Sequence, residues 1–122
     1  MPKSILLVED DPVQLKMEED FFNKEGFEVA VAASGEEALS MALKKTFDLI
    51  LLDILLPRVD GVEVCRRIKK SPNNTNTKII AVTSFDVTDV QKKAQAAGVD
   101  DLVIKPLNFV ELSKKIKTLL GN

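Results

Sequence analysis

Five short apolar segments alternate along the chain with five longer amphipathic ones. Continuous apolar runs at 4–8, 47–52, 78–82 and 101–104 are typical of strands that are covered on both faces, as in a parallel sheet. The segment 27–31 alternates more, which indicates a strand nearer a sheet edge. Helical spacing of apolar residues predicts helices at about 12–25, from 34 onwards, and at about 61–70, 88–97 and 109–120.

The first predicted helix carries two apolar stripes. Val13, Met17 and Phe21 form one stripe, and this stripe is expected to face the sheet. Leu15 and Phe22 form the other, which is expected to be partly exposed.

The order of strand then helix, five times over, predicts an α/β protein with helices on both faces of a parallel sheet. A length of 122 residues, without linker or repeat, fits a single domain, 1–122. Right-handed crossovers place the carboxyl ends of all the strands at one edge, where open α/β sheets bind ligands.

Chemically distinctive residues follow four of the predicted strands. Glu9 and Asp10 follow the first, Asp53 the third, Thr83 the fourth and Lys105 the fifth. Acids from two strands can hold a divalent cation, and the lysine adds a second positive charge. Two cations and a hydroxyl directed at one carboxylate suit phosphoryl transfer, which needs positioning and charge stabilisation. Asp53 would then be a nucleophile that forms an aspartyl-phosphate.

Each of these residues also has an ordinary structural explanation. Glu9 and Asp10 can be a solvated helix cap, Thr83 a normal strand residue, and Lys105 a surface cation. Asp53 on its own can serve only to bind loop amides. Their joint presence at successive strand ends is a far more specific signal than any one of them.

The composition of the chain limits the partners, the disulfides and the metals that are expected. The formal net charge of −2 favours neither direct nucleic acid binding nor an anionic membrane. No apolar run reaches the ~20 residues of a membrane helix. The single cysteine, Cys65, excludes an internal disulfide and fits the reducing cytoplasm. Because the chain has no His, any metal should be a hard, oxygen-bound cation such as Mg²⁺.

These segments resemble the receiver domain of two-component response regulators over the full length of the chain, in a single-domain form like that of chemotaxis regulators. The matching stretches are 5–11, 51–53 with 56, 57 and 61, 81–84, and 105–106. The resemblance implies a flavodoxin-like (βα)5 fold, with a doubly wound parallel sheet of five strands in the order 2-1-3-4-5.

The resemblance also implies roles for individual residues. Asp53 would accept a phosphoryl group from a phosphohistidine. Mg²⁺, or Mn²⁺ in its place, would be bound directly by Asp10, Asp53 and the backbone carbonyl of Leu55, and through water by Glu9.

At the phosphoryl group, the resemblance implies contacts from Thr83, its neighbour Ser84, and Lys105, with a cis peptide bond between Lys105 and Pro106. The implied partners are a histidine kinase or histidine phosphotransfer protein, and a downstream protein target or a covalently linked output domain. The signalling surface would comprise the fourth helix, fifth strand and fifth helix.

The chain departs from the family pattern around the fifth strand. Leu102 stands where an aromatic residue usually precedes the lysine by three positions, and Leu107 stands where Phe usually follows the Lys-Pro pair. The aromatic rotamer switch that the family implies therefore lacks its ring here.

A further departure concerns the lifetime of the aspartyl-phosphate. In the family, the residues two after the Asp and two after the Thr flank the approach of the hydrolytic water. Leu55 and Phe85 occupy these positions, and neither side chain can hydrogen-bond a water. We expect them to shield the phosphoryl group and prolong its life.

Two other functions stay open. One is a receiver-like binding module that is not phosphorylated, which failure to label with acetyl phosphate and Mg²⁺ would indicate. The other is a phosphatase with an aspartate nucleophile, which steady phosphate release from a generic ester would indicate. Such phosphatases carry a second Asp where this chain has Leu55. Catalysis is therefore expected to be limited to the protein's own phosphorylation and dephosphorylation.

Overall fold

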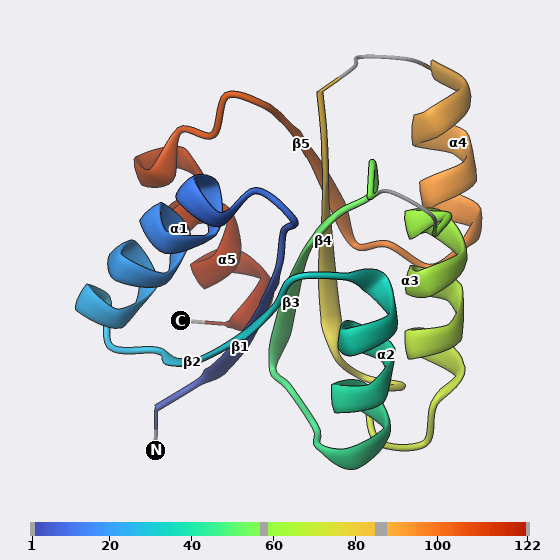
Figure 1. Ribbon diagram of the computed structural model, residues 1–122, viewed down its shortest axis with the longest axis horizontal. Helices are drawn as coiled ribbons and strands as arrows, with labels where there is room; N and C mark the ends of the chain where they lie inside the picture. The colour runs from blue at the N-terminus through green and yellow to red at the C-terminus, as the bar shows by residue number, and fades with distance from the viewer. Residues whose placement is uncertain (1, 57–58, 85–87, 122) are drawn as a thin grey trace.

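The computed structural model describes residues 2–56, 59–84 and 88–121, in which strands and helices alternate (Figure 1). The strands are β1 (Ser4–Val8), β2 (Glu28–Ala32), β3 (Leu49–Asp53), β4 (Lys78–Thr83) and β5 (Asp101–Ile104). The helices are α1 (Pro12–Lys24), α2 (Gly35–Lys44), α3 (Gly61–Lys70), α4 (Thr88–Ala96) and α5 (Phe109–Leu120). Every predicted element is present, with bounds within about two residues of the expected ones.

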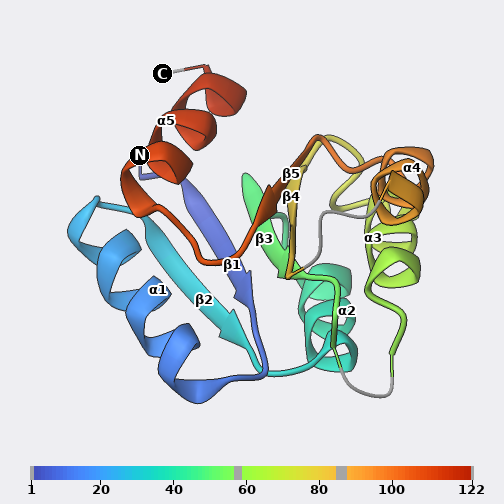
Figure 2. The ribbon, with the colours of Figure 1, turned by 90° about the horizontal axis from the view of Figure 1, so that it is seen from above.

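All strand pairs are parallel, and the order across the sheet is β2-β1-β3-β4-β5. Helices α1 and α5 cover one face of the sheet, and α2, α3 and α4 cover the other (Figure 2). This arrangement confirms the doubly wound, flavodoxin-like fold. The carboxyl ends of the strands lie together at the upper edge in Figure 1.

Apolar side chains form one core on each face of the sheet. The core under α1 and α5 includes Phe22, Leu51 and Ile116, and the core on the opposite face includes Leu52, Cys65 and Ile68. Central β3 is buried along its whole length, whereas edge strand β2 is partly exposed, as their sequence patterns predict. Among the described residues, no helix is long and apolar enough to cross a membrane.

Helix α1 turns a different face to the sheet from the one predicted. Val13 is 68% exposed and Met17 is 51% exposed, whereas Phe22 is fully buried. The prediction was therefore wrong for Val13, Met17 and Phe22, although Phe21 does pack against the core. Glu18 lies on the buried face, at helical spacing between Leu15 and Phe22. A charged residue at that position made the true core stripe look interrupted.

The start of α3 packs closely against the chain that follows β3. A Cβ atom added at Gly61 would lie 2.4 Å from Ile54 Cα and 2.5 Å from the Ile54 carbonyl oxygen. Only glycine fits such a backbone approach. The contact brings the first turn of α3 against the residue next to Asp53.

Candidate functional site

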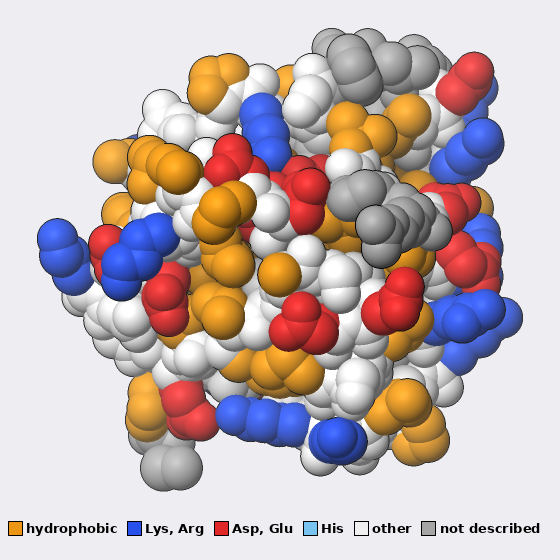
Figure 3. Space-filling model, in the orientation of Figure 1, with side chains coloured by type: hydrophobic (Ala, Val, Ile, Leu, Met, Phe, Trp, Pro, Cys, Tyr) orange, Lys and Arg blue, Asp and Glu red, His pale blue; other side chains and the backbone are white. Residues whose placement is uncertain are grey.

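Acidic side chains gather at the carboxyl edge of the sheet. Glu9 and Asp10 follow β1, and Asp53 ends the adjacent strand β3. One carboxylate oxygen from each of these three residues lies within 4.8 Å of the others. Glu9 and Asp53 are buried and Asp10 is exposed, so the group is accessible from one side. Figure 3 shows acidic side chains gathered beside a basic one in the upper part of the face.

Backbone hydrogen bonds hold the two buried acids in place. The N–H of Glu9 donates to the carbonyl of Ala32 at 3.1 Å, which extends the pairing of β1 with β2. Asp53 Oδ1 accepts from the N–H of Leu55 at 2.9 Å. The sheet therefore holds the backbone of Glu9, and the loop after β3 holds the carboxylate of Asp53.

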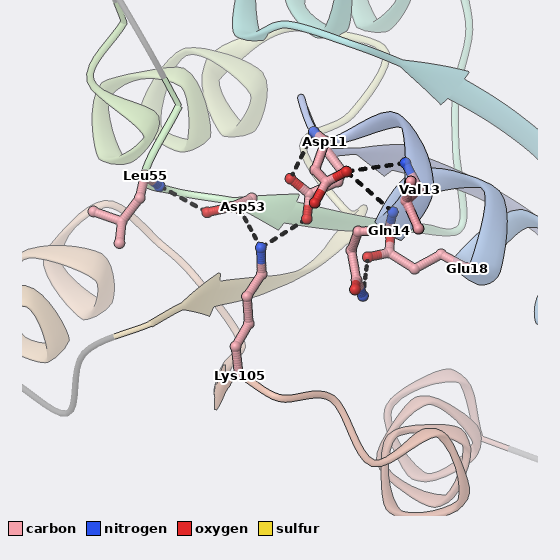
Figure 4. Close-up of polar contacts among 8 residues, drawn as sticks. Asp11, Val13, Gln14, Glu18, Asp53, Leu55 and Lys105 are labelled. Atoms are coloured by element: carbon pink, nitrogen blue, oxygen red, sulfur yellow. Dashed lines mark hydrogen bonds and ion pairs between the residues drawn. The ribbon is translucent and has the colours of Figure 1, made fainter.

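Lys105 connects the two buried acids. Its Nζ donates to Glu9 Oε1 at 2.7 Å and to Asp53 Oδ2 at 2.8 Å (Figure 4). Burial lowers the pKa of Lys105, but the hydrogen bonds with Asp53 and Glu9 outweigh burial and raise that pKa above its ordinary value. Lys105 is therefore a cation throughout the neutral range.

The backbone places Lys105 at the end of its strand. Its N–H donates to the carbonyl of Thr83 at 2.8 Å, and the peptide bond between Lys105 and Pro106 is cis, the conformation that the family resemblance implies. Thr83, the last residue of β4, is fully buried, while Ser84 after it is exposed. The cation and the hydroxyls thus come from neighbouring strand ends.

The pKa of Glu9 reflects competing influences. Burial raises it, the hydrogen bonds from Lys105 and from the Asp11 N–H lower it, and the nearby charge of Asp53 raises it again. The net result is a pKa above the ordinary value. A cation placed beside Glu9 would therefore favour its ionised form.

The residues present fit a hard divalent cation. Three carboxylates supply oxygen ligands, and their summed negative charge exceeds the single positive charge of Lys105. Asp10, Asp53 and Glu9 are the residues that would hold such an ion.

Other predicted site residues are placed as follows. Leu55 lies beside Asp53 and is 43% exposed, with its side chain directed away from Lys105 (Figure 4). Leu102 is half-buried and packs against the core on the side of α4. Phe85, the other half of the predicted shield, lies outside the described residues. One nearby acid, Glu18, was missed by sequence reasoning, although its spacing from Leu15 and Phe22 on one helix face was a usable signal.

A sequence model of the response regulator receiver domain matches residues 5–117. The chain belongs to this family. The receiver domain is 34% identical over 122 residues to the polar-differentiation response regulator DivK of Brucella anthropi, a match that covers 100% of this chain and 99% of that protein.

Solved receiver structures have the same fold. A CheY-like response regulator receiver domain protein from Methanospirillum hungatei superposes on this receiver domain with a TM-score of 0.94 at 33% identity, over 99% of this chain and 95% of that one. The receiver domain of a sensor histidine kinase from Pseudomonas aeruginosa superposes with a TM-score of 0.90 at 31% identity, over 100% of both chains. That crystal structure has a magnesium ion coordinated in the active-site cleft. The predicted family, fold and signalling class are thereby confirmed.

Proposed function

We propose that Asp53 of this receiver domain accepts a phosphoryl group from a phosphohistidine, and that the reaction depends on Mg²⁺. The observation that carries this proposal is the bridge from Lys105 to Glu9 and Asp53, beside the third acid, Asp10. Asp10, Asp53 and the backbone carbonyl of Leu55 would hold the ion, with Glu9 acting through water. Mn²⁺ would bind to the same oxygen ligands.

The transfer needs no group with a near-neutral pKa to move a proton. A carboxylate oxygen of Asp53 forms a bond to phosphorus while the bond from phosphorus to the donor's imidazole nitrogen breaks, and the electron pair stays on that nitrogen. When bound, Mg²⁺ would supply positive charge to the phosphoryl oxygens. Lys105 supplies a second positive charge, and Thr83 and Ser84 supply hydroxyl donors.

Other features support the wider signalling role. Receiver domains interact with histidine kinases and with downstream targets. Here the donor would be a histidine kinase or a histidine phosphotransfer protein in the cytoplasm, and residues 1–122 would act as one receiver domain. The phosphoryl signal would be read at the surface made by α4, β5 and α5, by a target protein or a linked output domain. Catalysis would be confined to Asp53's own phosphorylation and dephosphorylation.

Acetyl phosphate labelling tests the proposed phosphoacceptor. With Mg²⁺ present, intact mass spectrometry should show one added phosphoryl group on the wild type and on Asp20→Asn, a control at an exposed acid of α1. Asp53→Asn should stay unlabelled, and chelation of the metal should abolish labelling of the wild type and of Asp20→Asn.

Three results would each contradict the proposal. Label retained on Asp53→Asn would place the phosphoryl group on another residue. A wild type that stays unlabelled would favour a binding module that is not phosphorylated. Sustained phosphate release from a generic ester would instead favour a phosphatase, although apolar Leu55 offers no acid or base for that reaction.

A further inference from the structure

Glu18 is a buried carboxyl group that the proposed transfer does not use. It lies on α1 and is 2% exposed. In Figure 4 its side chain points toward the side of the site where Lys105 and Asp53 lie. Gln14 Nε2 donates to Glu18 Oε2 at 3.1 Å, while Glu18 Oε1 has no hydrogen-bond partner among the described residues.

The charged groups that influence Glu18 electrostatically belong to the cation site. They are Glu9 at the end of β1, Asp53 at the end of β3 and Lys105 at the end of β5. Burial raises the pKa of Glu18 to about 7; Gln14 and Lys105 oppose this rise, and the charges of Glu9 and Asp53 add to it. The carboxyl group therefore changes its charge within the neutral range, under the influence of whatever charge the site holds.

An apolar residue at position 18 would give a higher free energy of unfolding than Glu18 does. Its neighbours on the same face of α1 are Leu15 and Phe22, which belong to the core under the helix. A buried carboxyl group with one unpaired oxygen is destabilising unless a nearby cation favours its ionised form. Lys105 is already engaged by two other carboxylates. A divalent cation at Glu9, Asp10 and Asp53 would supply the missing positive charge.

We propose that Glu18 is a fourth, charge-regulating carboxylate of the cation site, which acts from behind the ligands without touching the ion. At slightly acidic pH it is mostly protonated when the site holds no divalent cation, and binding of a cation shifts it toward its ionised form. Cation binding therefore releases the Glu18 proton to solvent, and the resulting negative charge tightens the binding of the cation. By linkage, the two effects are equal in size. This inference rests on the proposed function, because it requires the cation site.

Calorimetric titration with Mg²⁺ alone, at pH 6 and pH 8, tests the role of Glu18. In the wild type, affinity should rise by about tenfold from pH 6 to pH 8, an order-of-magnitude value for site-to-site coupling. In Glu18→Gln the rise should be smaller by several-fold, because the variant has no carboxyl group at position 18 to titrate. Glu19→Gln, which removes a charge from the adjacent residue of α1, should follow the wild type.

The number of protons released on binding separates charge regulation from a packing role. Titrations near pH 7 in two buffers of different ionisation enthalpy should show proton release that is reduced in Glu18→Gln but not in Glu19→Gln. Equal release in all three proteins would overturn the inference. A wild type that binds no Mg²⁺ at either pH would instead overturn the cation site itself.

A direct measurement on the wild type guards against a variant that fails to fold. The side-chain carboxyl ¹³C signal of Glu18 should titrate near neutral pH without metal and shift to its ionised value when Mg²⁺ is added at pH 7. If Mg²⁺ binds but the chemical shift of the Glu18 carboxyl carbon does not change, the inference is wrong. That result would not affect the proposal that Asp53 is the phosphoacceptor.

Discussion

Lys105 sets the charge balance of the site at the scale of single residues. Its one ammonium group is shared between two buried carboxylates, each at hydrogen-bond distance. One positive charge cannot neutralise two carboxylates, so the site keeps a net negative charge that favours binding of a divalent cation. The same ammonium group lies 2.8 Å from Asp53 Oδ2, so it would lie close to a phosphoryl group if Asp53 accepted one.

Leu55 offers a test of the predicted shield over the proposed phosphoryl group on Asp53. It is 43% exposed beside Asp53 and has no hydrogen-bonding group on its side chain. In Leu55→Asn, an amide able to orient water should accelerate loss of the phosphoryl group. We expect the acceleration to be severalfold, below the ~10²-fold typical of strong general-base help. The decay of phosphorylated protein measures it.

The control for this prediction is Leu55→Met, which keeps an apolar side chain and should decay like the wild type. Decay that is unchanged or slower in Leu55→Asn would mean that Leu55 does not guard the bond. The contribution predicted for Phe85 can be tested in parallel with Phe85→Glu, which should also decay faster.

Glu18 predicts a pH dependence of stability in the metal-free protein. Burial raises its pKa from 4.5 to about 7, so its favourable contribution is present below pH 4.5 and is lost as the pH rises through about 7. Relative to the wild type, Glu18→Gln should therefore gain about 2 kcal/mol of unfolding free energy between pH 5 and pH 8.

Urea unfolding with a metal chelator present measures this difference at each pH. Glu19→Gln serves as the control and should show no such gain. A constant difference between Glu18→Gln and the wild type across the range would contradict the raised pKa.

At the scale of elements, the contact between α3 and the end of β3 positions the Asp53 loop. In Gly61→Ala, the new methyl group would meet the backbone of Ile54, which cannot move without shifting the end of β3. We expect a loss of about 1–3 kcal/mol of unfolding free energy and weaker Mg²⁺ binding. Urea unfolding and calorimetry measure the two effects.

Gly35 provides a matched control, because it is also the first residue of a helix. A Cβ atom there would lie 2.9 Å from a side-chain methyl of Val64, which can yield more readily than backbone. Gly35→Ala should therefore cost less than Gly61→Ala and leave Mg²⁺ binding unchanged. Equal costs would mean that the backbone approach at Gly61 is not the cause.

A second prediction at this scale concerns the surface made by α4, β5 and α5. Half-buried Leu102 replaces the usual ring, but two packings that differ by a few kcal/mol are enough for a switch. Phosphorylation should therefore still alter this surface. Beryllofluoride, a phosphoryl mimic, should change amide exchange between residues 85 and 107. Identical exchange in both states, in protein shown to bind the mimic, would place the response elsewhere.

At the scale of the whole molecule, the cation site links ligand binding to global stability. Bound Mg²⁺ stabilises only the folded chain, because unfolding separates Glu9 and Asp10 from Asp53. At a free Mg²⁺ concentration of about 100 times the Kd, the ion should add about 2.7 kcal/mol to the free energy of unfolding. Thermal unfolding with and without Mg²⁺ measures the gain.

One test variant and one control variant accompany this measurement. Asp10→Asn removes an exposed ligand without disturbing the core and should show much less stabilisation by Mg²⁺. Asp20→Asn removes an equally exposed acid away from the site and should behave like the wild type. Equal stabilisation of Asp10→Asn and the wild type would rule Asp10 out as a ligand.

The sequence by itself determined the elements, their order and the acids at the strand ends. Apolar runs such as 47–52 identify buried strands because strand and helix periodicities are local properties. The strand order came from the family resemblance. Asp53 was identified from the sequence alone, because a carboxylate that ends an apolar run can be recognised without knowing its neighbours in space.

Only the tertiary structure decided which face of α1 is buried and how the site's charges meet. Two apolar stripes compete on α1, and the choice between them depends on the helix's neighbours. Glu18 is therefore buried on the core face, although its charge argues for exposure. The bond from Lys105 to Glu9 joins residues 96 positions apart. Residues so far apart in sequence meet only because the crossovers set the parallel strands side by side. The carboxyl ends of the strands then lie at one edge of the sheet.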